Sequence, residues 1–272
     1  ELKSPEMLAY IGGFCAFKKT MRPIGQATAE QGRANLRVKP VRGSDRSVWK
    51  DLTDATGVHV DTIDAVLNDI TTNPMLQDTE NGSKIEFNFV DLVGHSYGGD
   101  PIAQYALEHS DNVRNVVFHK AVALEDPSVF NFPPRLKPFF TQELAPFIRH
   151  HDSDFSLSDI VRLGRHALAD PFQTIGEMYA CVRADNREAI THLGYLGVGI
   201  VIITGKKDNL IIPQPARDFA AELAKNSDIV SHYVELETDH LGPQKEPVYE
   251  GGAVIDAIEA IEQKKLPHLE LV

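Results

Sequence analysis

The sequence predicts an α/β protein: a doubly wound, mostly parallel sheet of about six strands, with a helical insertion near its middle. Two observations support this prediction. Short β-prone runs alternate with amphipathic helical stretches along most of the 272 residues, as a sheet covered by helices on both faces requires. Residues 125–192 interrupt the alternation with helix-prone sequence rich in proline and phenylalanine. We therefore expect a core formed by residues 1–124 and 193–272, and an inserted helical segment at 125–192.

The individual elements follow from the spacing of the apolar residues. The run Gly199–Thr204 is rich in β-branched residues, which is typical of a parallel strand buried on both faces. From Val60 to Ile70 the apolar residues recur at helical intervals. The same reasoning predicts strands near residues 7–11, 35–40, 86–93, 112–118, 199–204 and 231–236, and helices near 20–32, 60–70, 102–107, 215–225 and 252–263.

Composition limits the classes of partner. A net charge of −12 and a pI near 5.3 argue against a broad basic surface for nucleic acid or anionic membranes. The two cysteines, Cys15 and Cys181, do not make a disulfide scaffold. No apolar run approaches the roughly 18 residues of a membrane span, and no secretory signal segment is apparent, so we expect a cytoplasmic protein. Because the chain begins at Glu1, a leader sequence that has been removed remains an alternative. No oligomeric state is predicted.

The most informative motif is a Gly-x-Ser-x-Gly pentapeptide formed by residues 94–98. It follows a β-prone apolar run and is followed at once by a helical pattern. A serine at such a strand-to-helix turn has a strained backbone and presents its hydroxyl away from the sheet. A Cβ at Gly94 or Gly98 would collide with the neighbouring strand and helix. The motif therefore predicts that Ser96 is a nucleophile rather than an ordinary turn serine.

This motif, Gly94-His95-Ser96-Tyr97-Gly98-Gly99, resembles the nucleophile elbow of the α/β-hydrolase superfamily, and the resemblance extends over most of the chain. It implies that a catalytic acid and then a histidine follow Ser96. Family members commonly insert a helical cap over the serine at the position of residues 125–192. Compared with the family, the chain lacks residues for the usual leading hairpin.

The resemblance assigns the acid to Asp208, in the turn Gly205-Lys206-Lys207-Asp208 that follows a predicted buried strand. Some family members carry the acid after the strand that follows the nucleophile, which leaves Glu125 and Asp126 as alternatives. The base is assigned to His240, in the loop after the last predicted strand. Asp208 would orient the imidazole, and His240 would take the Ser96 proton.

An oxyanion hole is expected from two backbone N–H groups, those of Phe14 and Tyr97. Phe14 follows Gly12 and Gly13 in the loop after the first strand, and Tyr97 follows the nucleophile. In the family this loop usually begins His-Gly, whereas here Gly12 occupies the histidine position. The departure removes no donor, because the donors belong to the backbone.

These assignments together predict a serine hydrolase that cleaves a carboxylic ester, or a related acyl bond, of a small and partly apolar substrate through an acyl-enzyme. No cofactor and no metal ion are expected, and the polar run His150–Asp154 is interpreted as a solvated turn. Alternatives with the same three residues are acyl transfer and the hydrolysis of thioesters, lactones, amides or C–C bonds. The alternative from another class is a ligand-binding receptor on the same scaffold.

Overall fold

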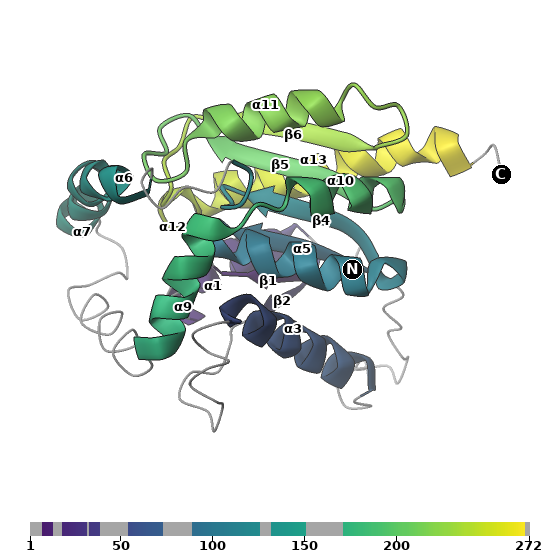
Figure 1. Cartoon of the computed structure of the whole chain (residues 1–272), viewed down its shortest axis with the longest axis horizontal. Helices are drawn as coiled ribbons and strands as arrows, with labels where there is room; N and C mark the ends of the chain where they lie inside the picture. The colour runs from purple at the N-terminus through teal and green to yellow at the C-terminus, as the bar shows by residue number, and fades with distance from the viewer. Residues whose placement is uncertain are drawn as a thin grey trace.

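A computed structural model describes residues 7–12, 18–31, 33–38, 54–72, 89–125, 132–150 and 171–269 of the chain. Its centre is one six-stranded sheet in the spatial order β2-β1-β3-β4-β5-β6, and every neighbouring pair is parallel (Figure 1). The predicted fold class is confirmed. The strands are β1 (Met7–Ile11), β2 (Ala34–Val38), β3 (Val90–His95), β4 (Val113–His119), β5 (Gly199–Gly205) and β6 (Ser231–Leu236).

Helices cover both faces of the sheet. One face packs against α1 (Lys18–Glu30) and α13 (Pro247–Leu269), which also contact each other. The opposite face carries α5 and α10 in front of the sheet in Figure 1. The described helices on this face are α3 (Ala55–Thr72), α5 (Gly99–Glu108), α10 (Arg187–Tyr195) and α11 (Pro213–Leu223). Among the described helices, none is both long enough and apolar enough to cross a membrane.

The central strands are mostly apolar because both of their faces are covered. All seven residues of β5 are buried. Ile200 and Ile202 belong to the core on the α5 side, whereas Val201 and Ile203 belong to the core on the α13 side. This two-sided burial explains why β5 appears in the sequence as an unbroken β-branched run.

The order of the strands fixes where a site can form. From β1 the chain moves outward to β2, then returns to β3 and continues in the other direction to β6. The order therefore reverses between the adjacent strands β1 and β3. At such a switch point the loops leave the carboxyl ends of the two strands in opposite directions and open a crevice between them. Ser96, the residue after β3, lies at this crevice.

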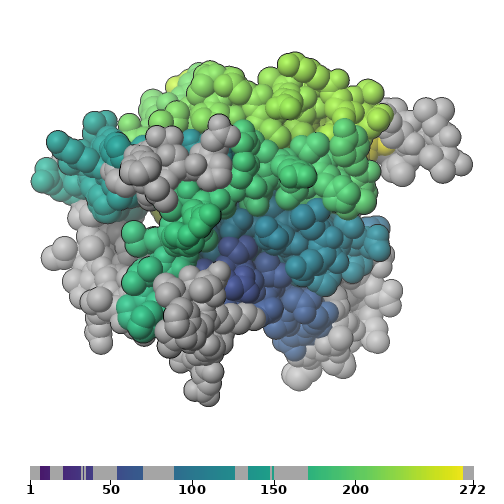
Figure 2. All heavy atoms as spheres, viewed as in Figure 1, coloured from purple at the N-terminus to yellow at the C-terminus, as the bar shows by residue number. Residues whose placement is uncertain are grey.

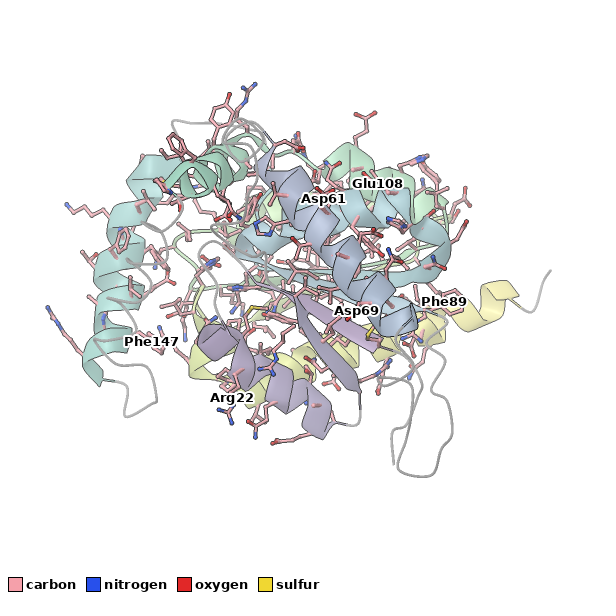
Figure 3. The ribbon with its side chains drawn as sticks, turned by 90° about the horizontal axis from the view of Figure 1, so that it is seen from below. Arg22, Asp61, Asp69, Phe89, Glu108 and Phe147 are labelled. Atoms are coloured by element: carbon pink, nitrogen blue, oxygen red, sulfur yellow. The ribbon has the colours of Figure 1, made fainter. Side chains whose placement is uncertain are left out.

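Between β4 and α10 the chain forms further helices within the segment that the sequence predicts to be an insertion, which we call the inserted segment. They are α6 (Phe132–Pro138), the π-helix η3 (Phe139–Leu144), α7 (Ala145–His150) and α9 (Pro171–Arg183). Phe147 on α7 and Phe89, just before β3, lie on opposite sides of the molecule (Figure 3). In the space-filling view the residues of α6 and α7 lie at the upper left of the molecule (Figure 2). The predicted division at residue 192 stays a prediction, but α10, which begins at Arg187, already packs against α5 and β5.

The turn at Ser96 is strained and closely packed. Ser96 has a positive φ of 57°, a conformation that a side-chain-bearing residue adopts only under strain. A Cβ added to Gly98 would lie 2.5 Å from the Ile11 carbonyl oxygen, and one added to Gly94 would overlap the Gly98 carbonyl. Glycine at both positions lets β1, β3 and α5 approach closely enough to hold the strained serine.

We predict that Gly98→Ala lowers the free energy of unfolding by about 1–3 kcal/mol, because the new methyl meets a backbone carbonyl that cannot move aside. Gly252→Ala in α13 is a matched control, since its Cβ would have its nearest neighbour 3.7 Å away. A helical glycine with free space should gain about 0.5–1 kcal/mol on the same change. Equilibrium urea unfolding of both variants provides the measurement, and equal effects would contradict the packing argument.

Candidate active site

Three side chains from separate loops meet at the carboxyl edge of the sheet. The Ser96 hydroxyl lies 3.0 Å from His240 Nε2, and His240 Nδ1 lies 2.9 Å from Asp208 Oδ2. All three residues are buried, with 7% of Ser96, 4% of His240 and 5% of Asp208 exposed. The structure therefore brings together the three residues that the sequence assigned to one site, which we call the triad.

The partners fix which imidazole nitrogen carries the proton. An ionised carboxylate can only accept a hydrogen bond, so His240 Nδ1–H donates to Asp208. In the neutral ring, Nε2 is then an acceptor, and it faces the Ser96 hydroxyl. This tautomer is the one that a base acting on Ser96 needs.

Asp208 is held by its own loop. Its Oδ1 accepts the N–H groups of Leu210 at 2.9 Å and Ile211 at 2.7 Å, which leaves Oδ2 for His240. The alternative acid Glu125 forms an ion pair with Arg135. The other alternative, Asp126, lies outside the described residues. Of the described acids considered from the sequence, Asp208 is the one that contacts His240.

His95 supports the His240 main chain from inside the core. Its Nε2 lies 3.2 Å from the His240 carbonyl oxygen, and the two rings are 5.0 Å apart. Burial, followed by the neighbouring His240, holds the pKa of His95 well below its usual value. A neutral His95 ring thus donates a hydrogen bond to the carbonyl of His240.

A fully buried ion pair lies beneath the histidine loop. Lys120, the residue after β4, is 0% exposed and pairs with Glu250 of α13. The Lys120 ammonium also donates to the Asp239 carbonyl at 2.7 Å and to Thr238 Oγ1 at 2.9 Å. His119 Nε2 donates to the second Glu250 oxygen at 2.6 Å. The pair therefore anchors the residues that immediately precede His240 to β4 and α13.

The proposed oxyanion donors are only partly described. Tyr97, whose N–H is one of them, is completely buried directly after Ser96. Phe14, the other, lies outside the described residues. The end of β1 does reach the elbow, because a Cβ on Gly98 would lie 3.0 Å from the Gly12 carbonyl oxygen.

Two residues of η3 also contact His240, and sequence reasoning did not assign a role to either. The Phe139 ring lies edge-on at 5.8 Å from the imidazole. Glu143 accepts the backbone N–H of His240 at 2.9 Å. Phe139 was one of many aromatic residues in the inserted segment. Glu143 carried no signal, since its partners are backbone amides 66 and 97 residues further along the chain.

No metal site emerges from the described ranges, where no three His, Cys, Asp or Glu residues are grouped around a common point. Residues 151–154 of the predicted solvated turn lie outside these ranges.

The buried ion pair predicts a pH dependence of stability. Burial alone would raise the pKa of Glu250, but the His119 hydrogen bond and the charges of His119 and Lys120 outweigh burial and lower the pKa to about 2 from 4.5. Because the folded pKa is depressed, this stabilisation is fully present above pH 4.5 and is lost as the pH falls towards 2. The difference corresponds to roughly 3 kcal/mol.

We therefore expect Glu250→Gln to lower the free energy of unfolding at pH 7 by about 3 kcal/mol or more, since Lys120 would remain buried without its counter-charge. The variant should also lose less stability than the wild type between pH 4.5 and 2. Urea unfolding at several pH values measures both effects. Glu246→Gln, at a nearby exposed carboxylate, is the control, and a Glu250→Gln variant as stable as this control would contradict the prediction.

Comparison with known proteins shows which fold this chain shares. The family model described as the alpha/beta hydrolase fold matches residues 87–160, which include β3, the elbow, α5 and β4. The sequence matches no curated protein.

Solved structures match over nearly the whole chain at low identity. An esterase from Exiguobacterium antarcticum is 15% identical with a TM-score of 0.64, covering 93% of this chain and 92% of the esterase. An enol-lactonase from Burkholderia xenovorans LB400 is 17% identical with a TM-score of 0.60, and the match covers 94% of this chain and 92% of the enol-lactonase. A bromoperoxidase from Bacillus anthracis is 16% identical with a TM-score of 0.65, and the match covers 94% of this chain and 92% of the bromoperoxidase. The parallel sheet, the elbow at residues 94–98 and these likenesses together identify the chain as a protein of the α/β-hydrolase fold.

Proposed function

We propose that this protein is a serine hydrolase that cleaves a carboxylic ester, or a related acyl bond, of a small and partly apolar substrate through an acyl-enzyme. The observation that carries the proposal is the continuous hydrogen-bonded series from the Ser96 hydroxyl through His240 to Asp208. The structural neighbours include an esterase and an enol-lactonase, which agrees with acyl chemistry.

In this mechanism Ser96 attacks the carbonyl carbon while His240 Nε2 takes the hydroxyl proton. Asp208 stabilises the imidazolium that forms, because its Oδ2 already accepts the Nδ1 proton. The N–H groups of Tyr97 and Phe14 would bind the oxyanion. His240 then returns the proton to the leaving alcohol. A water molecule activated by the same imidazole releases the acid and restores Ser96.

The apolar surroundings support a substrate with an apolar part. A hydrophobic cluster joins the elbow, the acid loop and the inserted segment. Phe139 belongs to its margin and faces the imidazole. Apolar side chains beside a reacting group exclude water from it and can bind the apolar portion of a ligand. The buried members are Tyr97, Val122, Ala123, Leu210 and Ile211, with Leu136, Phe139, Ala180, Cys181 and Ala184 packed against them.

The first test is a panel of p-nitrophenyl esters on the wild type and on Ser96→Ala. We expect ester hydrolysis and covalent labelling by a fluorophosphonate in the wild type. The variant should show no labelling and a kcat lower by about 10⁴–10⁶, because the nucleophile is missing. A folded wild type that neither hydrolyses nor labels would contradict the proposal and favour a binding role. Assays with thioester, lactone and amide substrates identify the kind of bond that is cleaved. An added alcohol acceptor distinguishes acyl transfer from hydrolysis.

The second test concerns the acid. Asp208→Asn should lower kcat by about 10⁴, because an amide can donate to Nδ1 and so favours the wrong imidazole tautomer. Glu125→Gln should leave kcat within a few-fold of the wild type, since that carboxylate is paired with Arg135. Steady-state kinetics of the two variants give the comparison. The reverse order of effects would move the acid away from Asp208.

A further inference from the structure

A buried carboxylate of the inserted segment joins the two loops that carry Asp208 and His240. Glu143 of η3 is only 2% exposed. Its Oε1 accepts the N–H of Asn209 at 2.7 Å, and its Oε2 accepts the N–H of His240 at 2.9 Å. One planar group thus fixes the spacing between the residue after the acid and the histidine itself.

The π-helical geometry of η3 directs two side chains at the same imidazole-bearing residue. Phe139 and Glu143 are four residues apart, and both contact His240, one through its ring and the other through its backbone. Single π-helical turns within longer helices occur frequently at functional sites. Here the π-helix lies between α6 and α7, so these contacts belong to the inserted segment rather than to the core.

Glu143 completes a set of contacts around the His240 backbone. The core holds the carbonyl side, because His95 bonds the His240 carbonyl and Lys120 donates to that of Asp239. Glu143 holds the His240 N–H. With its two backbone groups held from different parts of the fold, His240 has little freedom to shift relative to Ser96 and Asp208.

The carboxylate is expensive to bury at this position. Burial raises the pKa of Glu143, and the nearby charge of Asp208 raises it further, although the Asn209 and His240 amides act in the opposite direction. The partners that offset this cost are amides, namely the backbone N–H groups of Asn209 and His240 and the Asn209 side chain. An apolar residue would fill the space without this desolvation cost. The interactions that a carboxylate alone provides are two simultaneous charge-assisted hydrogen bonds to separate loops.

We propose that Glu143 is a positioning residue for the triad, which couples docking of the inserted segment to the alignment of His240 between Ser96 and Asp208. The inference rests on the proposed function, because alignment matters for turnover only if the triad is catalytic. When η3 is docked, both loops are held in register. When η3 moves away, the His240 N–H and the Asn209 N–H lose their common acceptor.

The decisive variant is Glu143→Gln, which keeps the size of the side chain. Its amide oxygen can accept one N–H, but its amide nitrogen faces the other N–H, so one of the two bonds is replaced by a donor–donor contact. Gln142→Ala is the matched control, because Gln142 is the adjacent residue of η3 and is exposed. We expect Glu143→Gln to lower kcat about 10- to 100-fold with KM changed less than about threefold, while Gln142→Ala matches the wild type.

A second readout separates positioning from a merely structural role. The His240 Nδ1 proton that is shared with Asp208 should give a downfield proton resonance in protein containing isotope-labelled histidine. We expect this resonance to shift or broaden in folded Glu143→Gln and to persist in Gln142→Ala. A Glu143→Gln variant that is less stable to urea but keeps both kcat and this resonance would overturn the proposal. If that variant does not fold, Glu143→Asp, which keeps the charge but cannot span both amides, is judged by the same readouts.

The experiment also distinguishes this inference from the proposed function. A folded wild type without hydrolysis or fluorophosphonate labelling would refute the proposed function. The resonance then decides the role of Glu143 by itself: its loss in Glu143→Gln supports the coupling, and its retention refutes it. If the wild type is active and Glu143→Gln is equally active with the resonance intact, the hydrolase proposal stands and the positioning role is wrong.

Discussion

The left-handed backbone of Ser96 is the constraint on which the rest of the site depends. A positive φ at this residue directs the chain from β3 into α5 within three residues and presents the hydroxyl at the edge of the sheet. The strain is tolerated because β1, β3 and α5 approach one another across Gly94 and Gly98. With the hydroxyl fixed there, its partners have to come from the loops after other strands. Because β5 and β6 run parallel to β3, the loops that follow them reach the Ser96 hydroxyl at the same edge of the sheet.

The charged side chains buried near this edge of the sheet hold the backbone of the loops that carry the triad. Lys120, Glu250 and Glu143 are each at most 2% exposed, yet they lie within or beside the loops of the triad. A buried ion pair is weak evidence of net stabilisation, because desolvation consumes most of the attraction between the charges. What such groups provide is direction: an ammonium selects carbonyls, and a carboxylate selects N–H groups. At His240 the two kinds of group hold opposite sides of one loop.

Sequence reasoning succeeded where the residues of a short segment determine the structure of that segment. The central strands appear as largely apolar runs because both of their faces are buried. The glycines of the elbow mark the close approach that Ser96 needs. Asp208 and His240 were assigned from the resemblance to the α/β-hydrolase superfamily, which expects an acid and a histidine in loops after strands that follow the nucleophile. Sequence reasoning missed Glu143 and the pairing of Lys120 with Glu250, which is 130 residues away. In the sequence these three are ordinary charged residues, because their partners are supplied only when the chain folds.

The different origins of the contacts at His240 have a thermodynamic consequence. His95 and Lys120 belong to the sheet core, so their hold on the histidine loop persists as long as the core is folded. Glu143 belongs to the inserted segment, so its hold exists only while η3 is docked. Coupling between two such events is reciprocal. If docking of η3 favours the alignment of His240, alignment favours docking by the same coupling free energy. Docking of η3 also brings Phe139 against the His240 imidazole, because Phe139 belongs to the same π-helix as Glu143.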